Sequence, residues 1–273
     1  MPSIGLIAGN GALPGLFARA ARRQGYRVLA VGHRGETDPG LAEEVDRLDW
    51  VRVGQVARIE RLLRGEGITE AVLAGGFSRM RAVREARPDL GLFRIVARLR
   101  SFRDDALLRA AADEFESAGI RIVAPTRFLT EILAPAGHLA GPHLDAAQER
   151  DVQLGEEVAR ALGRADVGQT VVVKNGHVLA LEAVEGTDAC IRRGAALGGA
   201  GVVVVKRSKP GQDERFDLPA IGPGTIEVLR EVGARVLSVE AGRTLLLEGD
   251  RLVRAAEAAG IAVVAGAAEQ TPS

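Results

Sequence analysis

The chain of 273 residues contains a single cysteine, Cys190. One cysteine cannot form a disulfide within the chain, and this usage is typical of the reducing cytoplasm. Cys190 follows Gly186-Thr187-Asp188-Ala189, where a helix is expected to begin and could activate a thiol. Because free cysteine is among the most buried residue types, we expect a small core side chain there instead.

The sequence also has few aromatic residues and no excess of charge of either sign. Aromatic residues make up 3% of the chain, and 36 Lys and Arg balance 36 Asp and Glu. Proteins that bind nucleic acid typically carry a basic surface, and single-strand binders add aromatic stacking platforms. The composition therefore argues against a nucleic-acid partner.

Long apolar runs are missing as well. No stretch of the sequence reaches the roughly 18 apolar residues expected of a membrane span. The first apolar run, 4–8, has no basic segment before it and ends at Gly9-Asn10-Gly11, so it does not have the pattern of a signal peptide. We expect a soluble cytoplasmic protein that touches a membrane at most peripherally.

The first half alternates apolar strands with amphipathic helices, the pattern of a parallel sheet covered by helices. It predicts a Rossmann-like α/β domain over residues 1–134. The expected strands are 4–8, 26–31, 46–53, 71–74 and 120–124. One expected helix ends at residue 24, and the others span 55–64, 90–103 and 105–117.

Two glycine turns follow strands of this expected sheet. Gly9-Asn10-Gly11 comes after the first strand, and Gly75-Gly76 precedes Ser78 after the strand at 71–74. In open parallel sheets, ligands bind where the carboxyl ends of the strands meet. We therefore expect the two turns to lie together and to contact a phosphate or ribose group.

The first turn departs from the dinucleotide-binding fingerprint. Pro14 stands where the third glycine belongs, and the second strand ends in Gly32-His33-Arg34 rather than in an acid. Arg34 would suit a 2′-phosphate, so an NADP-dependent oxidoreductase remains an alternative. Pro14 and the lack of an evident hydride-transfer site count against it.

The segment 90–103 has apolar residues at helical spacing, interleaved with arginines. It predicts either a core-facing helix with exposed arginines or a surface that contacts anionic lipid or an acylated substrate. Asp104 is expected to cap the next helix. This leaves Asp105 as a candidate substrate-binding or cation-binding residue.

Prolines and glycines in 135–144 predict a linker to a second domain, 145–273. His138 and His143 have no third ligand nearby, so we expect surface histidines rather than a zinc site. Asn175-Gly176 between two apolar arms predicts a β-hairpin. The hairpin, together with further helices and strands, predicts a mixed-sheet α/β domain. The expected helices are 143–162, 189–196, 225–231 and 250–259, and the expected strands are 202–205, 235–240, 244–247 and 261–264.

A charged stretch, 206–226, lies between a buried valine strand and a helix that follows Gly222-Pro223-Gly224. Bases there could bind phosphate, and acids could bind a hard cation. Glu185 and Asp188 lie at another strand-to-helix turn, where two acids could coordinate Mg²⁺. Asp188 could instead cap its helix, whereas Glu185 has no evident structural role.

Five blocks follow in order along nearly the whole chain: GLIAGNGALP at Gly5–Pro14, LAGGFSR at Leu73–Arg79, DDALLR at Asp104–Arg109, DVGQTVVVKNGHVLALEAVEGTDA at Asp166–Ala189 and KPGQDERFDLPAIGPGTI at Lys209–Ile226. Together they resemble the LpxI-type UDP-2,3-diacylglucosamine pyrophosphatase family of lipid A synthesis. Just ahead of the third block, Phe102-Arg103 stands where the family often has Lys-Gly, so Arg103 would keep the charge of that lysine but not its geometry.

The resemblance implies a two-domain α/β hydrolase that converts UDP-2,3-diacylglucosamine, with Mg²⁺, to UMP and 2,3-diacylglucosamine 1-phosphate (lipid X). It also implies a homodimer and peripheral contact with the cytoplasmic face of the inner membrane. The family's catalytic aspartate, in its RxDLPxIG block, falls on Asp217. The acyl chains would need an apolar cleft, expected between the domains, with 92–102 as a candidate wall.

This chemistry gives each candidate residue a role. Cleaving a pyrophosphate requires neutralising two phosphoryl groups and placing a water in line with the bond that breaks. The candidate catalytic residues are Asp217, Asp213, Glu185 and Lys209, and the candidate Mg²⁺ ligands are Asp217 and Asp188. The candidate substrate-binding residues are Gly9, Asn10, Gly11, Gly75, Gly76, Ser78, Asp105, Thr187, Asp188, Lys206, Gln212, Arg215 and Thr225.

A non-catalytic module that binds a nucleotide sugar or a lipid is the second alternative. It would bind its ligand tightly without Mg²⁺ and without turnover, and it would not depend on Asp217. It leaves the cluster of acids in the charged stretch unexplained.

Overall fold

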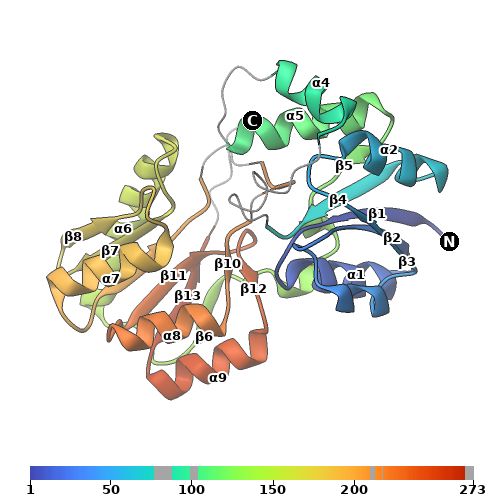
Figure 1. Ribbon diagram of the computed structural model, residues 1–273. Coiled ribbons are helices and arrows are strands. Elements are labelled where there is room, and N and C mark those ends of the chain that lie inside the picture. The colour runs from blue at the N-terminus through green and yellow to red at the C-terminus, as the bar shows by residue number, and fades with distance from the viewer. Residues whose placement is uncertain (77–87, 99–103, 210–212, 217, 268–273) are drawn as a thin grey trace. The chain divides into compact units, whose positions relative to one another are not determined.

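The computed structural model describes residues 1–76, 88–98, 104–209, 213–216 and 218–267, with the side chains of 97–98 and 104–107 excepted. It divides into two compact units (Figure 1). Unit 1 comprises Met1–Thr130 and Asp213–Phe216, and unit 2 comprises Glu131–Gln212 and Asp217–Ser273. Both units are α/β, which confirms the predicted fold class.

Unit 1 is built on a parallel five-stranded sheet of order β3-β2-β1-β4-β5. The central strand β1 is buried on both faces, as expected of a parallel strand with helices on either side. Because β2 and β4 flank β1 on opposite sides, the order of the chain reverses there, which is where such sheets bind ligands. The strands are β1 (Ser3–Ala8), β2 (Arg27–His33), β3 (Arg47–Val51), β4 (Glu70–Ala74) and β5 (Arg121–Ile122).

Helices cover both faces of this sheet (Figure 1). On one face α1 (Leu13–Arg23) buries Phe17, whose ring packs edge-on against Phe128 with centroids 5.1 Å apart. On the other face α2 (Val56–Gly65) and α5 (Asp104–Ser117) contribute to a separate apolar core. Helix α4 (Leu90–Arg98) packs on α2 and α5. Short 3₁₀ helices are η1 (Pro39–Glu43), η2 (Pro125–Arg127) and η3 (Thr130–Ile132).

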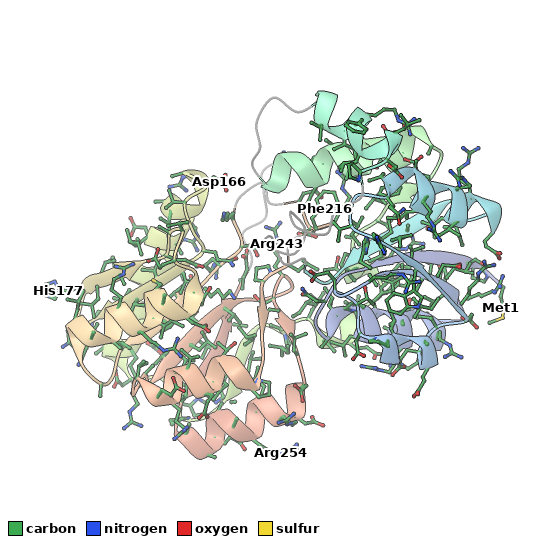
Figure 2. The ribbon with its side chains drawn as sticks, in the orientation of Figure 1. Met1, Asp166, His177, Phe216, Arg243 and Arg254 are labelled. Carbon is green, nitrogen blue, oxygen red and sulfur yellow. The ribbon has the colours of Figure 1, made fainter. Side chains whose placement is uncertain are left out.

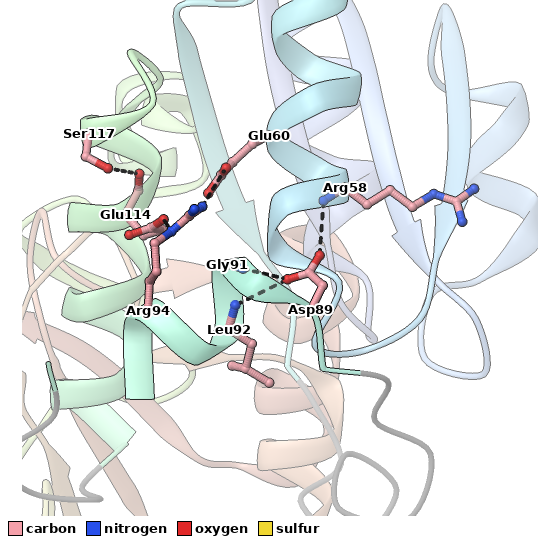
Figure 3. A network of polar contacts seen from close by, with 8 residues as sticks. All are labelled: Arg58, Glu60, Asp89, Gly91, Leu92, Arg94, Glu114 and Ser117. Atoms are coloured by element: carbon pink, nitrogen blue, oxygen red, sulfur yellow. Dashed lines mark hydrogen bonds and ion pairs between the residues drawn. The ribbon is translucent and has the colours of Figure 1, made fainter. Parts of the chain in front are cut away.

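A charged network joins these three helices (Figure 3). Arg94 of α4 bonds Glu114 of α5 and lies 3.5 Å from the Glu60 carboxylate of α2. Both carboxylates are buried, and burial together with the nearby Glu114 charge raises the pKa of Glu60. Asp89 accepts bonds from the Gly91 and Leu92 amides and from the Arg58 amide of α2. One arginine thus compensates two buried acids.

Replacing Arg94 with alanine is expected to destabilise unit 1 by about 1–3 kcal/mol, because two buried carboxylates lose a cation that contacts both. Since Arg94 lowers the pKa of Glu60, its removal should raise that pKa further in the folded state, so the loss should grow as pH rises from 5 to 7. Urea unfolding at both pH values measures it. The control Arg230→Ala breaks an exposed pair with Glu227 and should cost at most about 1 kcal/mol. Equal effects of the two changes would contradict the assignment.

Unit 2 contains a mixed six-stranded sheet of order β6-β13-β11-β9-β7-β8. Strands β9, β11 and β13 run parallel, whereas β6, β7 and β8 form antiparallel pairs with their neighbours. Asn175 and Gly176, both at positive φ, form the turn between β7 and β8, which confirms the predicted hairpin. The strands are β6 (Gly137–Ala140), β7 (Thr170–Lys174), β8 (His177–Leu181), β9 (Val203–Lys206), β11 (Val236–Glu240) and β13 (Ala262–Gly266).

Helices also cover both faces of the second sheet (Figure 1). Helix α6 (Ala146–Arg164) covers one face of the sheet. It packs so closely there that a Cβ at Gly155 would lie 2.4 Å from the side chain of Val205. The other face is covered by α7 (Thr187–Gly198), α8 (Pro223–Glu231) and α9 (Gly249–Ala259). A separate two-stranded sheet pairs β10 (Ala220–Ile221) with β12 (Leu245–Leu246). Cys190 is buried in α7, and desolvation raises the pKa of its thiol to about 11, so the core interpretation is confirmed.

The structure changes one expectation about 135–144. These residues do not form a free linker, because β6 lies within them and pairs antiparallel with β13 at the edge of the sheet. An edge strand is paired on one side only, so its sequence needs little apolar alternation. Gly137 and Gly141 are typical of a loop, so the sequence pattern did not indicate a strand here. His138 and His143 are exposed and stack with ring centroids 4.4 Å apart. Within the described ranges, no helix is both long and apolar enough to cross a membrane.

Candidate functional site

The two glycine turns of unit 1 lie against each other, as predicted. The Gly9 amide donates to the Ala74 carbonyl at 2.8 Å, and Asn10 and Gly76 exchange backbone hydrogen bonds of 2.8 and 3.2 Å. A Cβ at Gly9 would lie 2.3 Å from the Gly76 oxygen, and one at Gly75 equally close to the Asn10 oxygen. Only glycine permits this approach, which fixes both turns at the carboxyl edge of the sheet.

A buried polar cluster lies beside the first turn, at the end of β2. The Asn10 amide donates to the Glu36 carboxylate at 2.8 Å. The Ala8 carbonyl accepts two bonds, from Nδ1 of His33 at 2.9 Å and from the Thr37 hydroxyl at 2.6 Å. Burial lowers the pKa of His33, against smaller opposite effects of the Ala8 carbonyl and the Glu36 charge. This cluster makes the turn rigid.

The lowered pKa of His33 has a consequence for stability. As pH falls below the ordinary value near 6.5, the unfolded chain takes up the proton before the folded protein does, so stability should fall. The loss is at most about 1.4 kcal/mol per pH unit. His33→Asn keeps a donor but cannot titrate, so urea unfolding between pH 7.5 and 5.5 should show a smaller loss for it. An unchanged pH dependence would contradict this origin.

The charged stretch begins at the end of β9 in unit 2. Lys206 donates to the Ala220 carbonyl at 3.2 Å, and Lys209 bonds Asp166 at 3.1 Å. Between them Arg207, only 3% exposed, pairs with Glu156 at 3.0 Å and donates to the Ala267 carbonyl. Arg207 is not among the site residues predicted from the sequence. A charge directly after a buried valine strand is the signal that could have identified it.

The next described part of the stretch, Asp213–Phe216, belongs to unit 1. Its last residue, Phe216, is labelled in Figure 2. Both carboxylate oxygens of Asp213 accept bonds from Arg215, at 2.9 and 2.8 Å, and these bonds lower the pKa of Asp213. Arg215 also pairs with Glu116 of α5 at 3.0 Å. Phe216 packs on the apolar core beneath α2 and α5. The charged stretch is therefore divided between the two units, because Phe216 packs against the apolar core of unit 1.

The turn before α7 differs from the expectation for Glu185. Its carboxylate bonds Arg193 and accepts the Ala183 amide at 3.0 Å, so it has the structural role that the sequence did not show. The Arg193 bond lowers its pKa. Asp188 is exposed in the first helical turn, where Gly186 is the N-cap.

Two threonines among the candidates have structural contacts of their own. The Thr187 hydroxyl donates to Glu182 at 3.0 Å and lies 3.3 Å from the Thr170 hydroxyl. Thr225 lies in the first turn of α8, where its hydroxyl accepts the Gly222 amide at 3.4 Å and caps the helix. Both contacts fix strand-to-helix connections of unit 2.

Several candidate residues fall outside the description. Ser78, Gln212 and Asp217 lie outside the described residues, as does the side chain of Asp105. Within the described ranges, no three His, Cys, Asp or Glu side chains come together as a metal site. The described part of the chain therefore does not provide a complete ligand set for Mg²⁺.

Comparison with known proteins extends over both units. Residues 3–132 match the family model described as the LpxI N-terminal domain, and residues 135–264 match the LpxI C-terminal domain. The chain belongs to the LpxI family. The UDP-2,3-diacylglucosamine pyrophosphatase LpxI of Caulobacter vibrioides is 35% identical to it over 285 residues, which cover 100% of both chains. The resemblance predicted from the five sequence blocks is confirmed.

Two solved structures are distantly similar to this LpxI-family chain. The CobK precorrin-6A reductase is 15% identical with a TM-score of 0.31, covering 100% of this chain and 90% of that one. The N5-carboxyaminoimidazole ribonucleotide synthetase of Thermotoga maritima is also 15% identical, with a TM-score of 0.25, covering 68% of this chain and 42% of the other. Similarities this low carry no argument about function.

Proposed function

We propose that this protein hydrolyses the pyrophosphate of UDP-2,3-diacylglucosamine to UMP and 2,3-diacylglucosamine 1-phosphate, a step of lipid A biosynthesis. The observation that carries the proposal is the similarity to a relative of that name over the full length of both chains. The interlocked glycine turns support it by their position, since they lie at the carboxyl edge of the sheet, where α/β proteins bind phosphate and ribose groups.

In the proposed reaction, water adds to one phosphorus while the bridging P–O bond breaks, and the leaving phosphate takes the bond electrons. The protein must stabilise the negative charge that develops on both phosphoryl groups. Lys206 and Lys209, at the end of β9, are the cations proposed for this role. Asp217 is proposed to orient the attacking water or to bind a metal ion.

Mg²⁺ dependence is part of the proposal, and it rests on the family resemblance. A bound magnesium ion would neutralise phosphoryl oxygens. Asp217 and Asp188 are the proposed ligands, and waters and substrate phosphates would supply the rest, since Mg²⁺ keeps several such ligands. Turnover should then stop with EDTA and return with added Mg²⁺.

One assay tests the function directly. The purified full-length chain is incubated with UDP-2,3-diacylglucosamine, with Mg²⁺ or with EDTA, and UMP release is measured. Running it in ¹⁸O-water shows which phosphorus is attacked. Tight binding without release of UMP would favour a non-catalytic binding module instead. Equilibrium binding of NADPH without UMP release would favour the oxidoreductase alternative.

Peripheral contact with the inner membrane and a homodimeric state also belong to the proposal. Helix α4 supports the first, since Leu90, Phe93 and Val96 are exposed at a spacing of three residues, Phe93 by 61%, while Ile95 is buried. An exposed apolar stripe of this kind suits a lipid surface or an acyl chain. Co-sedimentation with anionic vesicles and light scattering of the purified protein measure the two properties.

A further inference from the structure

Unit 1 has a pocket of about 290 Å³ at the carboxyl ends of β2 and β3. Arg34 directly follows β2, Arg52 follows β3, and Arg58 lies in the first turn of α2. Two hydrogen bonds hold the loops in place, from the Arg34 amide to the Val51 carbonyl at 2.9 Å and from the Arg52 amide to Gln55 Oε1 at 2.8 Å. The lining residues are Arg34, Trp50, Val51, Arg52, Gln55 and Arg58.

The pocket is strongly cationic. Among the residues that the structure describes, the three exposed guanidinium groups have no ion pair and no side-chain hydrogen bond. Neighbouring Arg47, in contrast, pairs with Asp49 and Glu66. Within the described part of the chain, no acid lines the pocket or lies in the first turn of α2. Asp89 accepts a hydrogen bond from the Arg58 amide, and Figure 3 shows the Arg58 side chain extending away from it.

Trp50 gives the pocket a flat wall. A Cβ at Gly32 would lie 3.0 Å from its ring, so the indole lies close over β2, and the side chain remains half-buried. Indole and guanidinium groups both stack on aromatic bases, and guanidinium forks fit phosphate oxygens. The volume is near the lower limit of small-ligand pockets, which suits a pyrophosphate or part of a nucleotide.

We propose that this pocket binds the phosphate groups of a nucleotide, with Arg34, Arg52 and Arg58 as the cations and Trp50 as the stacking surface. Three unpaired cations around one cavity repel each other, and a polyanion would remove this repulsion. The proposal goes beyond the proposed hydrolysis and does not require it. The phosphates could come from the UDP part of the substrate or from a free nucleotide, and the experiment separates these sources.

Trp50 is the single tryptophan of the chain, so its fluorescence reports on the pocket. Full-length protein is titrated with UDP and with inorganic pyrophosphate, at constant ionic strength. Both should change the fluorescence in a saturable manner. Arg52→Ala and Arg58→Ala should each weaken binding at least about tenfold, since each removes a charge-assisted contact. Both residues are exposed, so the variants should fold. Arg254→Ala, which removes an exposed arginine of α9, is the control and should bind like the parent.

The outcomes are distinct. No binding of either probe, unchanged affinity in both variants, or equal binding of inorganic sulfate would overturn the proposal. If the variants also raise the KM for UDP-2,3-diacylglucosamine, the pocket binds the substrate's own phosphates. If KM is unchanged while UDP affinity falls, a free nucleotide is the ligand. The fluorescence titration uses no turnover, so binding of UDP and pyrophosphate can be measured whether or not UMP is released.

Discussion

Replacing Asp217 with alanine is expected to lower the rate of UMP release by at least about 10²–10³ while the protein remains folded. The reason is chemical: an acid that orients water or binds a metal beside a pyrophosphate acts mainly in the transition state, and losing one such group costs about 3–4 kcal/mol of barrier. The assignment rests on the family block around this residue. Single-turnover kinetics with UDP-2,3-diacylglucosamine measure the effect, and circular dichroism checks the fold.

Two further variants sharpen this test. Asp217→Asn keeps the size of the side chain, so a loss as large as that of Asp217→Ala would identify the negative charge as the required property. Asp250 is an exposed acid in the first turn of α9, and Asp250→Ala should retain the parent rate. If Asp217→Ala hydrolyses the substrate at the parent rate, the assignment of Asp217 is wrong.

The second large effect is expected at Gly75, where alanine should destabilise unit 1 by about 2–5 kcal/mol. Gly75 has φ +90°, a conformation unfavourable for any residue with a Cβ. The added Cβ would also lie 2.3 Å from the Asn10 oxygen, and that atom is held by the bond from Gly76. Neither strand end can move without breaking the contact between the turns.

Gly11 provides the matched control for Gly75. Its φ of +84° is almost the same, but apart from its chain neighbours no atom of the described residues would lie within 4 Å of a Cβ there. Gly11→Ala should therefore cost only the conformational part, about 1–2 kcal/mol. Urea unfolding followed by Trp50 fluorescence reports on unit 1 in both variants. Equal destabilisation by the two substitutions would show that the close approach of the turns contributes nothing.

The sequence predicted the regular parts of the fold because their signals are local. The apolar run of β1, the Asn175-Gly176 turn and the valine strand β9 are each specified by residues next to each other in the chain. The meeting of the two glycine turns was also predictable, since parallel strands bring their carboxyl ends to one edge.

The errors arose where a long-range contact decides the outcome. Nothing near Phe216 in the sequence shows that it packs in the core of unit 1 rather than beside Lys209. Glu185 seemed to lack a partner because Arg193 lies two helical turns further along the chain. Strand β6 was missed since its pairing with β13 depends on residues more than 100 positions away. Such contacts are set by tertiary packing, which local patterns do not encode.

The placement of Asp213–Phe216 in unit 1 limits how the protein can be divided. A gene cut after residue 130 would not yield two autonomous pieces. The first piece would lack Phe216 and the ion pairs around Arg215 that belong to its own core, and the second would expose that aromatic ring to water. An exchange of either half for a foreign domain would therefore have to take these four residues into account.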